Sequence, residues 1–176
     1  MLPTSARLAE LQLEPRCTPG APQSNYCGGL IDLILEAQPD TVLEIGANRG
    51  VSTECFLLLA RHVTVVDSWE GEWTKNFGAF VERTRGYRNL KIVRERSPQA
   101  LEQFPAASFD LVYIDGDHDE ESATRDIIAA QRVAKKWIAG HDFNLPGVSL
   151  AVRKTLRPNK LKVFSDMSWL IDAQHH

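Results

Sequence analysis

Two short polar segments contain the residues whose types most directly suggest chemistry. Asp115 and His118 lie in the segment YIDGDH, and His141 and Asp142 lie in the segment GHD. Carboxylate oxygens suit a hard cation such as magnesium, whereas a neutral imidazole shifts the preference toward manganese, iron or zinc. An imidazole can equally take a proton from a hydroxyl nucleophile. These residues therefore leave three roles open: a metal site, metal-free base catalysis by either histidine, and a structural role in turns and helix caps.

A loop bracketed by glycines lies upstream of these segments. In VLEIGANRGVST an apolar run ends, Gly46 and Gly50 enclose a short loop, and a helical pattern follows. Gly46 would let the backbone turn sharply and approach a ligand closely, and the helix N-terminus offers N–H groups to a carboxylate. Asp67 follows about twenty residues later, where an acidic side chain commonly accepts hydrogen bonds from ribose hydroxyls. Together these features predict a nucleoside-binding site.

Three further residues refine the type of ligand. Asn48 occupies the position of the second glycine in a dinucleotide-binding fingerprint, where a side chain would crowd a pyrophosphate. Ser97 lies at an expected strand-to-helix turn beside the adenine edge, and Trp69 lies where an indole could pack against the adenine face. The pattern therefore favours a nucleoside ligand without phosphate over a nicotinamide dinucleotide.

Alternating strands and helices are expected to position these groups. Short apolar runs predict parallel strands at 41–45, 63–67, 91–93, 111–114 and 137–141. Helical spacing predicts helices at 24–38, 52–60, 73–85, 98–103, 120–134 and 148–156. Two apolar runs in LKVFSDMSWLID predict a final hairpin. The expected fold is α/β: a doubly wound, Rossmann-like, mostly parallel sheet with helices on both faces and a C-terminal antiparallel hairpin.

Length, charge and cysteine content limit the functions to consider. The 176 residues predict a single domain over residues 24–176, after an N-terminal extension over residues 1–23 with a short helix at 5–13. A net charge of −3, with basic and acidic residues interleaved, argues against a nucleic-acid partner. Apolar runs fall short of the roughly 20 residues of a membrane span. Three cysteines without CxxC spacing suggest reduced thiols and a cytoplasmic protein.

Three segments resemble the class I S-adenosylmethionine-dependent methyltransferases. VLEIGANRGVST is similar to their first motif, VTVVDSWEG to their second, and FDLVYIDGDHDEESATRDI to their fourth-strand motif. The combination of IDGDH with GHD resembles the small O-methyltransferase-like subgroup of that family. The resemblance implies the cofactor S-adenosylmethionine, with a binding set of Glu44, Gly46, Ala47, Asn48, Gly50, Ser52, Asp67, Ser68, Trp69, Ser97 and Asp115.

The resemblance also implies roles within this set. Glu44 and Gly46 would contact the methionine part of the cofactor, and Asp67 would bind the ribose hydroxyls. The residues expected around adenine are Ser68, Trp69 and Ser97. In related metal-dependent O-methyltransferases, acidic residues at the fourth and fifth strand ends bind a divalent cation. Here a magnesium or manganese ion would be bound by the corresponding set of Asp115, Asp142 and His141.

The expected reaction is methyl transfer, a reaction of enzyme class EC 2.1.1. Transfer from a sulfonium to an oxygen is an in-line displacement, so the protein mainly has to align the nucleophile and the methyl group. We expect the acceptor to be a hydroxyl oxygen of a small molecule or sugar. The base or metal ligands would be Asp115, His118, His141 and Asp142. Because the chain has almost no inserted cap, the open site suits a bulky acceptor or a homodimer in which a neighbour closes it. A nucleoside-binding module without catalysis and an NAD(P)-dependent oxidoreductase are the alternatives.

Overall fold

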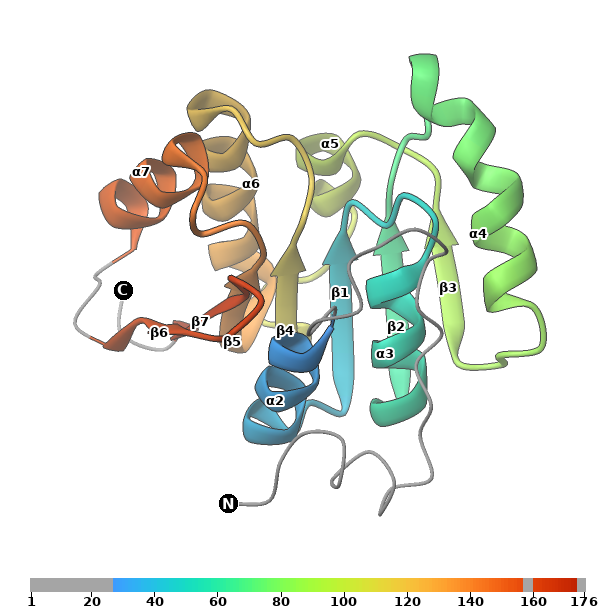
Figure 1. Cartoon of the computed structure of the whole chain (residues 1–176), viewed down its shortest axis with the longest axis horizontal. Coiled ribbons are helices and arrows are strands. Elements are labelled where there is room, and N and C mark those ends of the chain that lie inside the picture. The colour runs from blue at the N-terminus through green and yellow to red at the C-terminus, as the bar shows by residue number, and fades with distance from the viewer. Residues whose placement is uncertain (1–26, 157–159, 174–176) are drawn as a thin grey trace.

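The computed structural model describes residues 27–156 and 160–173, so the expected N-terminal extension and its helix at 5–13 lie outside the described residues. Within these residues, a central sheet has helices on both of its faces (Figure 1). The strand order is β3-β2-β1-β4-β5-β7-β6, and β7 is antiparallel to both of its neighbours. The prediction of a Rossmann-like, mostly parallel sheet with an antiparallel C-terminal hairpin is therefore confirmed.

Most of the strands coincide with apolar runs of the sequence, because a strand that is covered on both faces buries side chains that point to either side. The parallel strands are β1 (Thr41–Ile45), β2 (His62–Val66), β3 (Leu90–Val93), β4 (Phe109–Ile114) and β5 (Ala134–Gly140). The hairpin consists of β6 (Lys162–Val163) and β7 (Trp169–Asp172). The fifth strand begins at Ala134 rather than at Trp137, since Ala134 pairs with Phe109 across a register shift in β4.

Two apolar cores lie on opposite faces of the sheet. One contains side chains of α2 (Gly28–Ala37), α3 (Val51–Leu59) and α4 (Asn76–Thr84). The other contains side chains of α5 (Ser97–Glu102), α6 (Glu120–Val133) and α7 (Pro146–Thr155). Helices pack on both faces of the sheet, and the loops at the strand ends extend from this packed layer.

One predicted helix is divided in the structure. The segment expected to be helical over 73–85 consists of a 3-10 helix, η1 (Gly71–Lys75), followed by α4. No residue of η1 is buried, so no packing favours extension of α4 toward its N-terminus. Figure 1 shows this segment standing above the carboxyl ends of the strands.

The order of the strands brings distant segments to one edge of the sheet. β1 pairs in parallel with β2 on one side and with β4 on the other, so the strand order reverses at β1. Ligands of such sheets bind at this point, outside the carboxyl ends of the strands. The glycine loop after β1 and the polar segments after β4 and β5 consequently meet at the same edge.

Candidate active site

A cavity of about 910 Å³ opens at the carboxyl ends of the parallel strands. Loops that follow all five of these strands contribute to its wall. The residues predicted to bind a cofactor that line this cavity are Gly46, Asn48, Asp67, Ser68, Ser97 and Asp115. The residues predicted to be catalytic also line it, namely Asp115, His118, His141 and Asp142. The fold therefore places the predicted nucleoside site and the predicted catalytic groups around one cavity.

Gly46 occupies a position that no other residue can fill. Its φ angle is +81°, and a Cβ added to it would lie 2.2 Å from the carbonyl oxygen of Asp115. The backbone at the end of β1 thus lies directly against the backbone at the end of β4. Only glycine has both the conformational freedom and the lack of a side chain that this close approach requires.

The Asp67 carboxylate holds the glycine loop by hydrogen bonds to its backbone. Its Oδ2 accepts hydrogen bonds from the backbone N–H groups of Ala47 (2.9 Å) and Asn48 (3.0 Å). Its Oδ1 accepts a hydrogen bond from the N–H of Trp69 at 2.8 Å. Asp67 also lines the cavity. One carboxylate therefore organises the loop after β1 and remains accessible to a ligand.

Glu44 is fully buried beneath the loop and does not line the cavity. Its Oε1 accepts a hydrogen bond from the hydroxyl of Ser52, and its Oε2 accepts one from the hydroxyl of Thr53 at 2.5 Å. Burial raises the pKa of Glu44 to about 8, although both hydroxyls oppose this shift and Asp115 adds to it. The hydrogen bond between Glu44 and Ser52 joins β1 to the first turn of α3. Because the glycine loop connects these two elements, this bond supports the loop.

Trp69 faces the core rather than the cavity. Its side chain is buried, and its ring centroid lies 4.9 Å from that of Phe77 and 4.8 Å from that of Phe80. The indole Nε1–H donates a hydrogen bond to the carbonyl of Asn48 at 2.8 Å. In this structure Trp69 holds the glycine loop against α4. Ala47 and Gly50, also predicted to bind the cofactor, are buried in the same layer.

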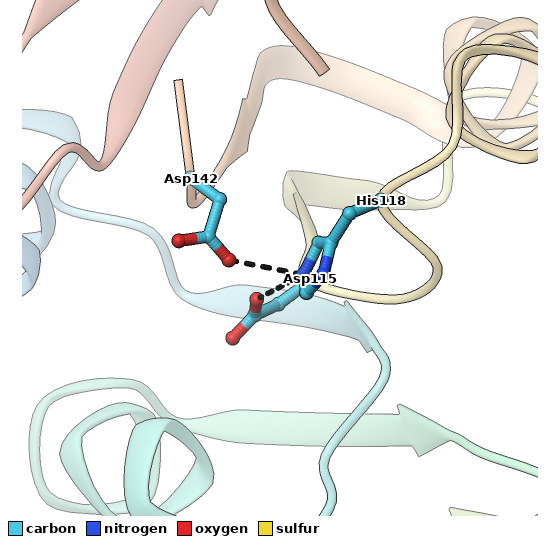
Figure 2. A group of neighbouring side chains, drawn as sticks. All are labelled: Asp115, His118 and Asp142. Carbon is cyan, nitrogen blue, oxygen red and sulfur yellow. Dashed lines mark ion pairs between the residues drawn. The ribbon is translucent and has the colours of Figure 1, made fainter. Parts of the chain in front are cut away.

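The polar segments after β4 and β5 meet at the other end of the cavity. Figure 2 shows the carboxylates of Asp115 and Asp142 directed toward the imidazole of His118. The His118 Nε2 atom lies 2.9 Å from Oδ2 of Asp142 and 4.0 Å from Oδ1 of Asp115. The carboxylates of Asp115 and Asp142 raise the pKa of His118 to about 10, although partial burial opposes the shift. His118 therefore carries a proton at neutral pH while both carboxylates face it.

Asp142 is the shared partner of both histidines. His141 Nδ1 lies 3.2 Å from Oδ1 of Asp142. Burial alone would lower the pKa of His141, but the hydrogen bond to Asp142 and the charge of Asp115 raise it to about 9. Hydrogen bonds from His118 and His141 hold the pKa of the Asp142 carboxyl well below its usual range. The φ angle of Asp142 is +56°, a left-handed conformation that aspartate tolerates better than most residues.

Three of these side chains form a donor set suited to a divalent cation. One ligand atom each from Asp115, His118 and Asp142 lies within 4.8 Å of the other two. Two carboxylates and one imidazole fit manganese better than magnesium, which prefers oxygen ligands alone. The set contains His118, whereas His141 is the histidine ligand expected from the sequence. That difference arises from the loop after β4, which turns back across the end of β5.

Some residues that line the cavity were not anticipated from the sequence. Glu70 and Arg96 form an ion pair at 2.6 Å between the loops after β2 and β3. Asp126 lines the cavity from α6, a helix to which the sequence assigned no site residue. A signal for Asp126 was present, since it interrupts the apolar stripe of that helix with a carboxylate.

The segment from β1 to the loop after β5 shows the family of the chain. A family profile described as a methyltransferase domain matches residues 43–143. This match covers more than half of the chain and runs from β1 to the residue after Asp142. The chain belongs to this methyltransferase family. A comparison with curated proteins finds no match to this methyltransferase domain.

Solved structures share the fold of this methyltransferase domain over most of its length. Cofactor-bound Rv0187 from MTB is 20% identical with a TM-score of 0.63, over 100% of this chain and 92% of that chain. A protein assigned as an O-methyltransferase from Klebsiella pneumoniae is 16% identical with a TM-score of 0.64, over 98% and 90%. The Podospora anserina methyltransferase PaMTH1, bound to S-adenosylhomocysteine, is 14% identical with a TM-score of 0.58, over 81% and 75%. At these identities the likeness establishes the fold.

Within residues 27–156 and 160–173, each helix is too short or too polar to cross a bilayer.

Proposed function

We propose that the protein is an S-adenosylmethionine-dependent methyltransferase that transfers a methyl group to a hydroxyl oxygen of a small molecule or sugar. The observation that carries this proposal is the single cavity shared by the Gly46 loop and the group of Asp115, His118 and Asp142. The methyltransferase family of the chain supports the reaction class. Structural neighbours bound to S-adenosylhomocysteine or described as O-methyltransferases support the cofactor and the type of acceptor.

The charges along the cavity favour this cofactor. Eight acidic residues line the wall against two arginines and two histidines, and S-adenosylmethionine carries a sulfonium and an amino group with positive charge. We assign the methionine end to the neighbourhood of Gly46 and Asp115, and the ribose to Asp67. The same negative wall disfavours nucleic-acid phosphates, so we propose a small acceptor.

His118 is the group we propose to accept the proton of the acceptor hydroxyl. The cofactor supplies the leaving group, so the protein needs to align the hydroxyl and remove its proton. In the ion-paired state His118 is already protonated, because Asp115 and Asp142 raise its pKa to about 10. It can act as a base only after the charge of these carboxylates is compensated.

We propose that a divalent cation provides this compensation. When bound, the cation would stabilise the negative charge that develops on the acceptor oxygen. Asp115 and Asp142 would hold it, and their charge would then no longer retain the proton on His118. His141, paired with Asp142, would orient that carboxylate. We further propose a cytoplasmic location, which the free thiols of Cys27 and Cys55 support.

Calorimetric titration tests the cofactor, and product analysis tests the reaction. We expect S-adenosylmethionine to bind and NAD not to bind. Incubation with S-adenosylmethionine and a panel of hydroxylated small molecules and sugars should release S-adenosylhomocysteine with at least one acceptor. Binding of the cofactor without product over a broad panel would favour a nucleoside-binding module. Preferential binding of NAD would contradict the proposal and favour an oxidoreductase.

A further inference from the structure

Asp126 is a buried carboxyl in the cavity wall. The proposed methyl transfer assigns no role to it. It lies in the second turn of α6, is only 5% exposed, and lines the cavity. The Ser97 hydroxyl at the start of α5 donates a hydrogen bond to its Oδ1. This bond joins α5 to α6 at the point where both helices meet the cavity.

The core alone does not explain a carboxylate at this position. Ala123, Ile127 and Ala130 on the same side of α6 are buried in the apolar core. A carboxylate in such surroundings is unfavourable unless donors surround it. Burial raises the pKa of Asp126 to about 6 and the Asp117 charge adds to this, although the Ser97 hydroxyl and the Arg125 charge oppose the shift. These two groups therefore compensate the buried charge only in part.

The second oxygen of Asp126 lies at the wall of the cavity. A Cβ added to Gly116 would lie 3.2 Å from Oδ2 of Asp126, which places this oxygen beside the loop after β4. Among residues 27–156 and 160–173, Ser97 is the hydrogen-bond donor to this carboxyl. Oδ2 is consequently an acceptor that a ligand can reach.

The neighbouring surfaces suit the flat faces of a purine. Ile45, Val66 and Pro98 line the cavity and offer apolar contacts. With the ribose at Asp67, at the end of β2, the base extends toward Ser97, which follows the adjacent strand β3. An ionised carboxylate only accepts hydrogen bonds, and the 6-amino group of adenine is the donor that a purine presents on its edge.

We propose that Asp126, held by Ser97, recognises the 6-amino group of the cofactor's adenine and makes the site selective for adenine over hypoxanthine. This inference rests on the proposed function. S-inosylhomocysteine carries a carbonyl oxygen in place of the amino group, so its base presents an acceptor to the carboxylate. A site that pairs with a donor rejects an analogue that lacks it, because a buried polar group then remains unpaired.

The test compares the affinities of S-adenosylhomocysteine and S-inosylhomocysteine by calorimetry. The wild-type protein should prefer S-adenosylhomocysteine by about 100-fold or more, since donors to charged groups contribute strongly. Asp126→Asn, whose amide can also donate to a carbonyl, should reduce this preference at least about tenfold. Glu102→Gln, an exposed change on the neighbouring helix α5, should leave both affinities unchanged.

Several outcomes would overturn the inference. Wild-type affinities for the two ligands within about threefold of one another, a result that needs no variant, would exclude recognition of the amino group. An unchanged preference in Asp126→Asn, or an equal loss for both ligands together with a lower melting temperature, would leave Asp126 as a structural link between helices. Failure of the wild-type protein to bind either ligand would overturn the proposed function as well. That result differs from equal binding of both ligands, which would overturn only the role of Asp126.

Discussion

The Nε2 atom of His118 lies 2.9 Å from Oδ2 of Asp142, so the loop after β4 is joined by an ion pair to the end of β5. Asp115 completes the group from the first position after β4, at a longer distance from the same imidazole. Asp142 is the central residue because it also contacts His141. A change at this one carboxylate should therefore alter the whole group.

Replacement of Asp142 by asparagine should separate catalysis from cofactor binding. Without the carboxylate, His118 loses its closest partner, and its pKa should fall from about 10 toward its ordinary value. We nevertheless expect turnover to fall by about 100-fold or more, because the proposed cation loses a ligand and His118 loses the partner that orients it. Affinity for S-adenosylhomocysteine should stay within about threefold of wild type, because the Gly46 loop is untouched.

Product release measures turnover for this variant, and NMR titration of the imidazole measures the pKa of His118. Glu102→Gln, an exposed change on α5, is a suitable control. Wild-type turnover in Asp142→Asn, in the presence of excess chelator, would contradict both the base and the cation parts of the mechanism.

Manganese should bind to Asp115 and Asp142 and release the proton of His118. The cation compensates the two carboxylates that hold this proton, so binding near pH 7 should lower the pKa of His118 from about 10 and displace the proton. At a concentration about 100 times its dissociation constant, the ion should add about 2.7 kcal/mol to the free energy of unfolding. Calorimetry in buffers of different ionisation enthalpy measures the protons released.

Asp115→Asn combined with Asp142→Asn is the matched control for the manganese experiment. The double variant should lose both the stabilisation and the proton release, and added chelator should reverse them in the wild type. Equal stabilisation of the wild type and the double variant would place the ion elsewhere on the protein.

Glu44 should make stability depend on pH between about 4.5 and 8, which are its ordinary pKa and its raised pKa in the folded protein. Over this range the unfolded chain releases the proton first, so the contribution of Glu44 to stability falls as the pH rises. Glu44→Gln keeps the shape but cannot ionise. The melting temperature of the variant should therefore rise relative to wild type between pH 5 and pH 8.

Thermal unfolding of both proteins across that range provides the measurement for Glu44. The difference between the variant and the wild type isolates Glu44 from other groups that titrate in the same range. A difference that stays constant, or that shrinks with rising pH, would show that Ser52 and Thr53 hold Glu44 ionised instead.

Loss of the Asp67 carboxylate should release the glycine loop. Three backbone N–H groups, of Ala47, Asn48 and Trp69, donate to this one side chain. Asp67→Ala should reduce the free energy of unfolding by about 2–4 kcal/mol, since hydrogen bonds to charged groups contribute more than neutral ones. Asp67→Asn should cost less, because one amide oxygen still accepts.

Denaturation in urea measures the stability of both Asp67 variants, with Glu102→Gln as the surface control. Asp67→Ala should also lose most of its affinity for S-adenosylhomocysteine. A variant as stable as wild type would show that the loop is held chiefly by Trp69 and the close packing at Gly46.

The sequence by itself determined the fold and the place of the site. Short apolar runs separated by helical patterns allow few arrangements other than a doubly wound sheet, because parallel strands need covered faces and right-handed crossovers. The glycine loop and Asp67 follow consecutive strands, so their convergence at one edge required no knowledge of packing. Asp115 and Asp142 could be paired for the same reason.

Only the tertiary structure decided which way individual side chains face. The sequence could not show that Trp69 turns into the core against Phe77 and Phe80. Both phenylalanines lie on α4, and the sequence does not give the position of this helix relative to Trp69. It could not choose between His118 and His141, since that depends on how the loop after β4 folds back. Asp126 meets the cavity only because α5 and α6 pack together and bring it to Ser97. Loop direction and contacts between helices arise from packing across the whole domain, so the spacing of residues along the sequence does not predict them.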